Sequence, residues 1–233
     1  IIAHVDHGKT TIVDKLLVNS GLFRDNQEVN VRMMDSNDLE KERGITILAK
    51  NTAVDYGEHH INILDTPGHK DFAEDTYRTL TAVDSVILVV DVANGVEAQT
   101  ERLMEVCRMR NTPVIIFINK LDRDGKEAFD LLDELESKLN IKVCPLSWPI
   151  GMGDRFKGVY NIYKNELNLF SPNKTGISDD VKSIADLNSK EIDSIIGEGP
   201  AAELREELEM IEGVYNSFDR ATYLSGEVAP VFF

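Results

Sequence analysis

The sequence predicts an α/β fold in which a mostly parallel sheet carries helices on both faces. Apolar runs of strand length recur within residues 1–150, at 61–64, 85–91 and 113–119. Amphipathic segments of helix length separate these runs, at 71–82, 98–110 and 126–139. Continuously apolar strands that alternate with helices are typical of parallel sheets buried on both faces. Ile1-Ile2 resemble the end of a strand before a helical pattern over residues 10–20, so the alternation begins with the first residues.

The composition indicates a cytoplasmic protein without a broad nucleic-acid-binding surface. Of 233 residues, 42% are hydrophobic, and no apolar run approaches the roughly 18 residues that a membrane helix needs. With a net charge of −16, we expect no DNA partner, and only a local contact with any RNA, because phosphate neutralisation needs clustered Lys and Arg. Cys107 and Cys144 lack metal-type spacing and are expected to be reduced thiols. We also expect no signal peptide, no membrane partner and a monomer.

Residues 3–10 form the first motif, which departs from the phosphate-loop pattern G-x-x-x-x-G-K-[ST] only at Ala3. Backbone amides in such a loop cradle a β-phosphate, and the following helix adds its positive N-terminal end. Lys9 is expected to bridge the β- and γ-phosphates, and the Thr10 hydroxyl to ligate Mg²⁺. The alternative is a simple glycine-containing turn between a strand and a helix. The predicted nucleotide-binding residues of this P-loop NTPase motif are His4, Val5, Asp6, His7, Gly8, Lys9, Thr10 and Thr11.

A second motif, Asp65-Thr66-Pro67-Gly68-His69, directly follows the apolar run 61–64. The Asp65 carboxylate is expected to reach Mg²⁺ through a water, and the Gly68 amide to approach the γ-phosphate. His69 takes the catalytic role of orienting the attacking water, which glutamine fills in Ras-like switches. Ordinary turn chemistry is the alternative, since Asp-x-Pro-Gly is common in turns.

The third motif, Arg43-Gly44-Ile45-Thr46, lies in a strongly charged segment. It predicts a switch loop in which Thr46 joins Mg²⁺ and the γ-phosphate only when GTP is bound. A solvated loop would explain the same charges. For Arg43 we expect an ion pair that anchors the loop rather than a role in catalysis.

The fourth motif, Asn119-Lys120-Leu121-Asp122, ends the apolar run 113–119. The Asp122 carboxylate can accept both the N1 hydrogen and the exocyclic amine of guanine, a pattern that adenine lacks. The Lys120 stem is expected along the base and ribose, and Asn119 is expected to tie this loop to the phosphate loop. The four motifs together predict binding and hydrolysis of GTP, with GTP/GDP and Mg²⁺ as ligands.

As a set, these motifs resemble those of the translational GTPases, the elongation-factor class. Residues 61–233 are most similar to the peptide chain release factor 3 family, through segments 71–84, 120–124, 148–151 and 156–160. Residues 1–56 instead resemble the ribosome-associated TypA/BipA GTPases, through segments 4–7 and 35–46. A chimera and a divergent homologue would both give this pattern.

The resemblance implies a GTPase stimulated by the ribosome that promotes recycling of class-1 release factors at termination. A TypA/BipA-like ribosome-associated GTPase is the alternative, and a truncated nucleotide-binding module without intrinsic hydrolysis is the alternative of another class. The resemblance also implies that Val5 and Ile45 form an apolar gate beside His69.

The composition changes near Gly151-Met152-Gly153, which suggests a domain boundary. We expect a GTP-binding domain over residues 1–150, an inserted α+β subdomain over 151–228 and a returning strand over 229–233. The inserted part contains a polar segment, 171–189, and an acidic amphipathic helix, 201–212. The resemblance places a fifth guanine-binding motif after the returning strand, so the sequence is expected to be a fragment that stops before it.

Overall fold

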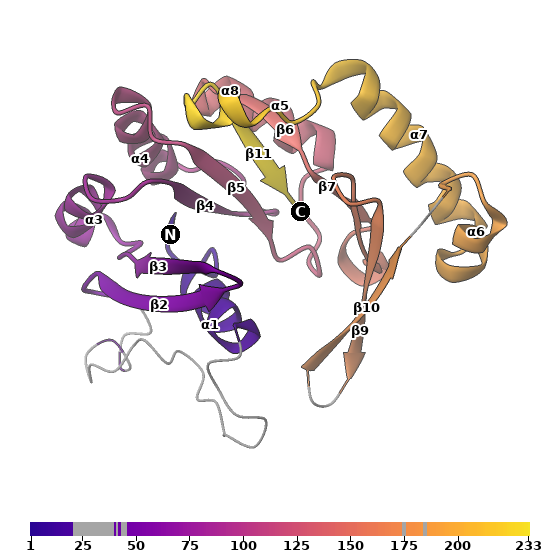
Figure 1. The fold of residues 1–233 in the computed structure, drawn as a ribbon, viewed down its shortest axis with the longest axis horizontal. Helices are drawn as coiled ribbons and strands as arrows, with labels where there is room; N and C mark the ends of the chain where they lie inside the picture. Colours follow the sequence, from indigo (N-terminus) through magenta and orange to yellow (C-terminus); the bar gives the residue numbers. More distant parts are fainter. Residues whose placement is uncertain (21–39, 41, 43–45, 174–175, 184–185) are drawn as a thin grey trace.

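A computed structural model describes residues 1–20, 40, 42, 46–173, 176–183 and 186–233 (Figure 1). Its central sheet has five strands in the order β1-β4-β5-β11-β6, and every neighbouring pair is parallel. The strands are β1 (Ile2–Ala3), β4 (Val86–Asp91), β5 (Val114–Asn119), β6 (Lys142–Pro145) and β11 (Val228–Phe232). This sheet confirms the predicted α/β fold.

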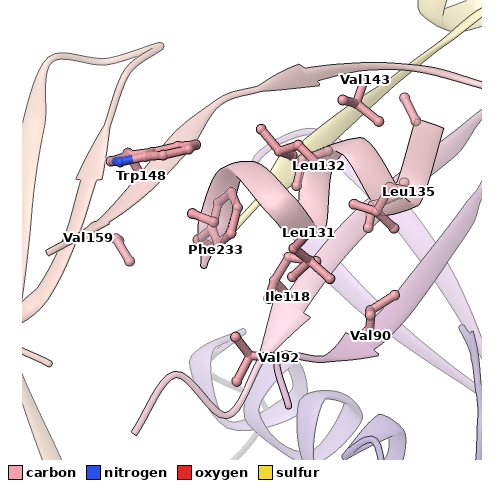
Figure 2. Packing of buried hydrophobic residues seen from close by; sticks show 14 of the residues in the cluster. Val90, Val92, Ile118, Leu131, Leu132, Leu135, Val143, Trp148, Val159 and Phe233 are labelled. Carbon is pink, nitrogen blue, oxygen red and sulfur yellow. The ribbon is translucent and has the colours of Figure 1, made fainter. Parts of the chain in front are cut away.

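Four helices accompany the parallel strands: α1 (Lys9–Asn19), α3 (Ala73–Leu80), α4 (Ala98–Met109) and α5 (Ala128–Leu139). Figure 1 shows α1 on one side of the strands and α4 and α5 on the other. Leu131, Leu132 and Leu135 of α5 belong to the same buried cluster as the strand residues Val90 and Ile118 (Figure 2). Each such side chain contributes about 1.5–3 kcal/mol when it is fully buried. Among the described residues, no helix is long and apolar enough to cross a bilayer.

An antiparallel hairpin of β2 (Lys50–Tyr56) and β3 (His59–Asp65) lies beside β1. The main-chain nitrogen of Ile1 donates to the Leu64 carbonyl over 2.7 Å, and the Thr66 hydroxyl donates to the Ile1 carbonyl over 2.8 Å. The sequence predicted β3 but gave no signal for β2, because Val54 is its only fully buried side chain. Val13 and Leu17 of α1 pack on the hairpin residues Val54 and Ile63. The hairpin therefore places Asp65 next to the start of α1.

The later part of the chain forms a second, antiparallel sheet in the order β10-β9-β8-β7. Its strands are β7 (Ser147–Ile150), β8 (Gly158–Asn161), β9 (Glu166–Asn173) and β10 (Gly176–Ser183). The other helices with bounds in the described part of the chain are two short 3₁₀ helices and three α-helices: η1 (Lys70–Phe72), η2 (Gly153–Arg155), α6 (Lys190–Ile196), α7 (Glu198–Val214) and α8 (Arg220–Leu224). The acidic helix expected over residues 201–212 lies within α7.

The domain division at residue 150 stays a prediction. β7 lies just before this boundary and pairs with β8 in the second sheet. β6 runs into β7 through Leu146, whose amide still donates to the Val231 carbonyl of β11 over 2.8 Å. The chain thus passes from one sheet to the other without a loop.

Trp148 joins the two sheets in one core (Figure 2). Its ring is fully buried and lies 4.7 Å from the Phe129 ring of α5 and 5.2 Å from the Phe233 ring, measured between centroids. The indole nitrogen donates to the Glu207 carboxylate of α7 over 2.7 Å, so the buried polar atom is satisfied.

The two cysteines are free and buried, as expected of reduced thiols. Burial raises the pKa of Cys107 to about 11 and also raises the pKa of Cys144. Both thiols are therefore protonated and unreactive at neutral pH.

Candidate nucleotide-binding site

The phosphate-loop motif forms the turn between β1 and α1. Asp6 (φ 63°) and Gly8 (φ 93°) have positive φ angles. Left-handed residues of this kind form the anion-binding turns in which successive backbone amides point toward one concave side. Gly8 precedes the first residue of α1, and among the described residues no side chain caps that helix end. The amides of the first turn thus keep free donors beside the positive end of the helix dipole, as an anion site requires.

Four side chains from three of the predicted motifs meet next to this loop. The Lys9 ammonium lies 3.2 Å from Oδ1 of Asp65, and the Thr10 hydroxyl donates to Oδ2 of the same carboxylate over 3.2 Å. The Thr10 and Thr46 hydroxyl oxygens are 3.1 Å apart. Lys9, Thr46 and Asp65 are all buried.

This cluster has the donor set that Mg²⁺ prefers, namely two hydroxyls and a carboxylate. Asp65 Oδ1 is buried and accepts no well-directed hydrogen bond from the described residues, although it forms an ion pair with the Lys9 ammonium. A buried carboxylate oxygen with this spare hydrogen-bonding capacity, beside two hydroxyls, fits a hydrated cation. Among the described residues, no group of three His, Cys, Asp or Glu side chains is suited to a metal, so the hydroxyls would be essential to such a site.

The segment of residues 65–69 packs closely against the phosphate loop. A Cβ atom on Gly68 would lie 3.2 Å from the Ala3 carbonyl oxygen and 3.3 Å from the His4 carbonyl group, so a side chain there would push the two loops apart. The Thr76 hydroxyl donates to the Pro67 carbonyl over 3.0 Å and anchors the turn from α3.

His69 is half-exposed, and the Asp71 amide donates to its Nδ1 over 3.2 Å. In the neutral ring the proton must therefore lie on Nε2. The Asp71 carboxylate lies 3.5 Å from the same Nδ1, so a protonated ring would also have a partner.

The Asn119–Asp122 loop makes two contacts with the phosphate loop. The Asn119 amide donates to the His7 carbonyl over 2.8 Å, which is the contact expected of it. Lys120 (φ 68°) donates to the Asp6 carbonyl, and its ammonium lies 2.7 Å from the Asp91 carboxylate. Asp122 is exposed in the loop that follows β5.

Two carboxylates that were not predicted from the sequence, Asp91 and Glu97, lie at the two ends of the loop that joins β4 and α4. Burial alone would raise the pKa of Asp91. This effect is outweighed by the hydrogen bonds from Lys120, Ala93 and Asn94 and by the charge of Lys120, so the pKa of Asp91 lies below its usual value. One signal in the sequence could have identified Asp91. Like Asp65, it is an acidic residue at the carboxyl end of a strand.

Several predicted residues are not brought into the cluster. Thr11 is exposed in the first turn of α1, and Val5 is half-buried. Arg43, Gly44 and Ile45 lie outside the described residues, so the expected ion pair of Arg43 and the gate between Val5 and Ile45 stay predictions.

An amide-rich turn, an oxygen cluster suited to Mg²⁺ and an Asn-Lys-x-Asp loop at one edge of a parallel sheet define a P-loop GTPase domain. The sequence model described as "Elongation factor Tu GTP binding domain" matches residues 1–221. The chain therefore belongs to the elongation factor Tu GTP-binding domain family, and it is a GTP-binding domain of the translational GTPases.

A crystal structure of a protein from Thermus thermophilus has a similar fold, with a TM-score of 0.72 and 22% sequence identity. The similarity covers 99% of this chain and 36% of that chain, so the present sequence spans about a third of that protein's length. Neither comparison distinguishes the release factor 3 resemblance from the TypA/BipA resemblance.

Proposed function

We propose that this chain binds GTP with Mg²⁺ and hydrolyses it as the switch domain of a ribosome-associated, cytoplasmic translation factor. The observation that carries the proposal is the convergence of Lys9, Thr10, Thr46 and Asp65 within 3.1–3.2 Å contacts, beside a helix start that no side chain of the described residues caps. Such a cluster combines a cation for phosphate oxygens with hydroxyl and carboxylate ligands for a metal.

In this proposal each residue of the phosphate site has a separate role. The amides of residues 6–10 hold the β-phosphate, and the Lys9 ammonium moves from Asp65 to the β- and γ-phosphates. Thr10 and Thr46 would hold Mg²⁺ directly, and Asp65 would hold it through a water. The ion, when bound, neutralises charge on the phosphate oxygens. The Asp122 carboxylate selects guanine.

Hydrolysis is assigned to His69 with the help of Gly68. The Gly68 amide approaches the γ-phosphate because the glycine allows close contact with the phosphate loop. The Asp71 amide fixes Nδ1 of His69, so Nε2 is the ring atom that orients the attacking water.

For the biological role, we propose the function of release factor 3, with the ribosome and class-1 release factors as partners. The resemblance of residues 71–84 and of later segments to that family supports this choice. The net charge of −16 favours contact with few rRNA phosphates. We further propose that the protein acts as a monomer.

The alternatives predict different responses to ribosomes. GTP turnover should be measured alone, with vacant ribosomes, and with ribosomes that carry a class-1 release factor at a stop codon. Stimulation together with faster dissociation of the release factor supports the proposal. Stimulation without any effect on the release factor indicates a TypA/BipA-like role, and tight GTP binding without hydrolysis in all three conditions indicates a binding module.

The Mg²⁺ assignment has its own test. Thr10→Ala removes a ligand, so it should weaken the Mg²⁺ dependence of GDP binding, whereas Thr81→Ala, at an exposed threonine outside the four motifs, should leave it unchanged. Titration of Mg²⁺ against the GDP dissociation rate gives this comparison. Equal Mg²⁺ dependence in the two variants would remove Thr10 from the metal site.

A further inference from the structure

We propose that Asp91 and Glu97 are positioning residues in the loop between β4 and α4 (residues 91–97). From there they hold both the phosphate loop (residues 3–10) and the loop of residues 119–122, here called the guanine loop. This inference deepens the proposed nucleotide binding and rests on it. Neither residue belongs to the four nucleotide-binding motifs.

Glu97 holds the phosphate loop through an imidazole. Its Oε2 lies 2.6 Å from Nε2 of His7, and its Oε1 lies 3.5 Å from Nε2 of His4. The His7 ring is fully buried, and its other nitrogen lies 3.2 Å from the Val89 carbonyl and 3.3 Å from the Asp91 amide. The ring is thus held on both sides, and it is attached to the backbone between the two left-handed residues of the phosphate loop.

Asp91 holds the guanine loop through a lysine. Its Oδ2 lies 2.7 Å from the Lys120 ammonium, which also donates to the Asp6 carbonyl. The same carboxylate accepts the Ala93 amide over 2.8 Å through Oδ1. Because Asp91 is buried, its loss would leave the Lys120 cation without its carboxylate partner.

The loop of residues 91–97 is itself fixed from outside the nucleotide site. Lys126 of the segment before α5 donates to the Asn94 carbonyl over 3.0 Å, and Lys138 donates to the Val96 carbonyl over 3.3 Å. Both lysines pair with Glu134 of α5. α5 therefore supports the loop between Asp91 and Glu97. Through this loop, the phosphate loop and the guanine loop are both held against the same helix.

Loss of either carboxylate should let one nucleotide loop move without removing any group assigned to the nucleotide. Asp91→Asn and Glu97→Gln should each speed the dissociation of fluorescent GDP by about tenfold, the scale of one hydrogen bond to a charged group. The matched controls are Asp84→Asn, which lies just before β4, and Glu105→Gln on α4. Both control residues are exposed, so the dissociation rate should stay at the wild-type value.

Two further measurements separate positioning from general damage. In a Lys120→Met background, Asp91→Asn should have no additional effect, because its partner is already gone. Without nucleotide, the thermal unfolding midpoint of Glu97→Gln should match that of Glu105→Gln, while the amides of residues 7–10 exchange hydrogen faster. The proposal would be overturned if Asp91→Asn and Lys120→Met had additive effects on the GDP dissociation rate. It would also be overturned if the two glutamate variants showed equal amide exchange.

These outcomes also separate this proposal from the function on which it rests. If the wild-type chain did not retain GDP at all, the proposed nucleotide binding would fail. Amide exchange in the nucleotide-free chain would still decide whether Glu97 holds the phosphate loop.

Discussion

The Asn119 side-chain amide donates a 2.8 Å hydrogen bond to the His7 carbonyl oxygen, across 112 residues of sequence. The contact forms because β1 and β5 flank β4 in the sheet, so that their carboxyl ends lie at the same edge. It also explains Gly8, where a Cβ atom would lie 2.3 Å from the Asn119 amide nitrogen. The phosphate loop and the guanine loop are therefore held together by a direct hydrogen bond and close packing.

Asn119→Ala should weaken GDP binding by loosening the contact between these two loops. Removal of the amide leaves the His7 carbonyl without its donor, at a cost of about 1–3 kcal/mol. Calorimetry should then show a rise in the GDP dissociation constant of roughly 5- to 150-fold. Asn62→Ala, an exposed position on β3, is the control, and an equal effect in both variants would contradict the role of this contact.

Asp122→Asn should change the choice of base. An amide presents a donor where the carboxylate presents only acceptors, so it mispairs with the guanine amine and suits the xanthine carbonyl. Preference should move from GDP towards XDP by roughly 10²-fold or more, since unpaired polar groups in a binding site carry large penalties. Competition binding with GDP and XDP measures this change in preference. A variant that still prefers GDP would show that Asp122 does not read the base.

Lys9→Ala and His69→Ala should separate binding from catalysis. Lys9 is assigned to phosphates in the bound ground state, so its loss should weaken GTP binding by at least about tenfold. His69 is assigned only to the attacking water, so its loss should leave GTP affinity intact and lower stimulated hydrolysis by about 10²-fold or more. Binding isotherms and single-turnover hydrolysis with ribosomes give both values. Normal hydrolysis by His69→Ala would remove the histidine from the mechanism.

Fluorescence of the single tryptophan should report the ionisation of Glu207. Burial raises the pKa of Glu207 above its usual 4.5; the hydrogen bond from Trp148 opposes this shift, and the charges of Glu203 and Glu127 add to it. The emission should change over a pH range above 4.5, as the hydrogen-bond acceptor of the indole gains a proton. Glu207→Gln should abolish this step, and Glu206→Gln, a neighbour on the same helix, should keep it.

The same shift fixes the direction of the stability change. A raised pKa means that the folded chain holds the Glu207 proton more tightly than the unfolded chain does. The stability that protonated Glu207 contributes is therefore present in full below pH 4.5, and it is lost as the pH rises through the pKa of Glu207 in the folded chain. At neutral pH, urea unfolding should show Glu207→Gln to be more stable than the wild type; lower stability would contradict the assignment.

Prediction from sequence succeeded for elements whose signal is local. The parallel strands β4 and β5 are continuous apolar runs, and α4 and α5 have clear helical spacing, so each could be recognised without its neighbours. β2 could not be recognised, because it packs through Val54 alone and is held by its pairing with β3. The position of β7 in the second sheet depends on β8, which follows it only after Gly151–Lys157.

The sequence by itself determined the ligand class, because the phosphate-loop turn and the Asn-Lys-x-Asp turn are contiguous segments whose geometry their own residues dictate. The tertiary structure decided which distant groups support these turns. His7 meets Glu97 across 90 residues, and Lys120 meets both Asp91 and, 114 residues away, Asp6. Such pairs follow from the order β1-β4-β5, which brings the carboxyl ends of three strands together. Strand order results from packing of the whole core, so no local pattern encodes it.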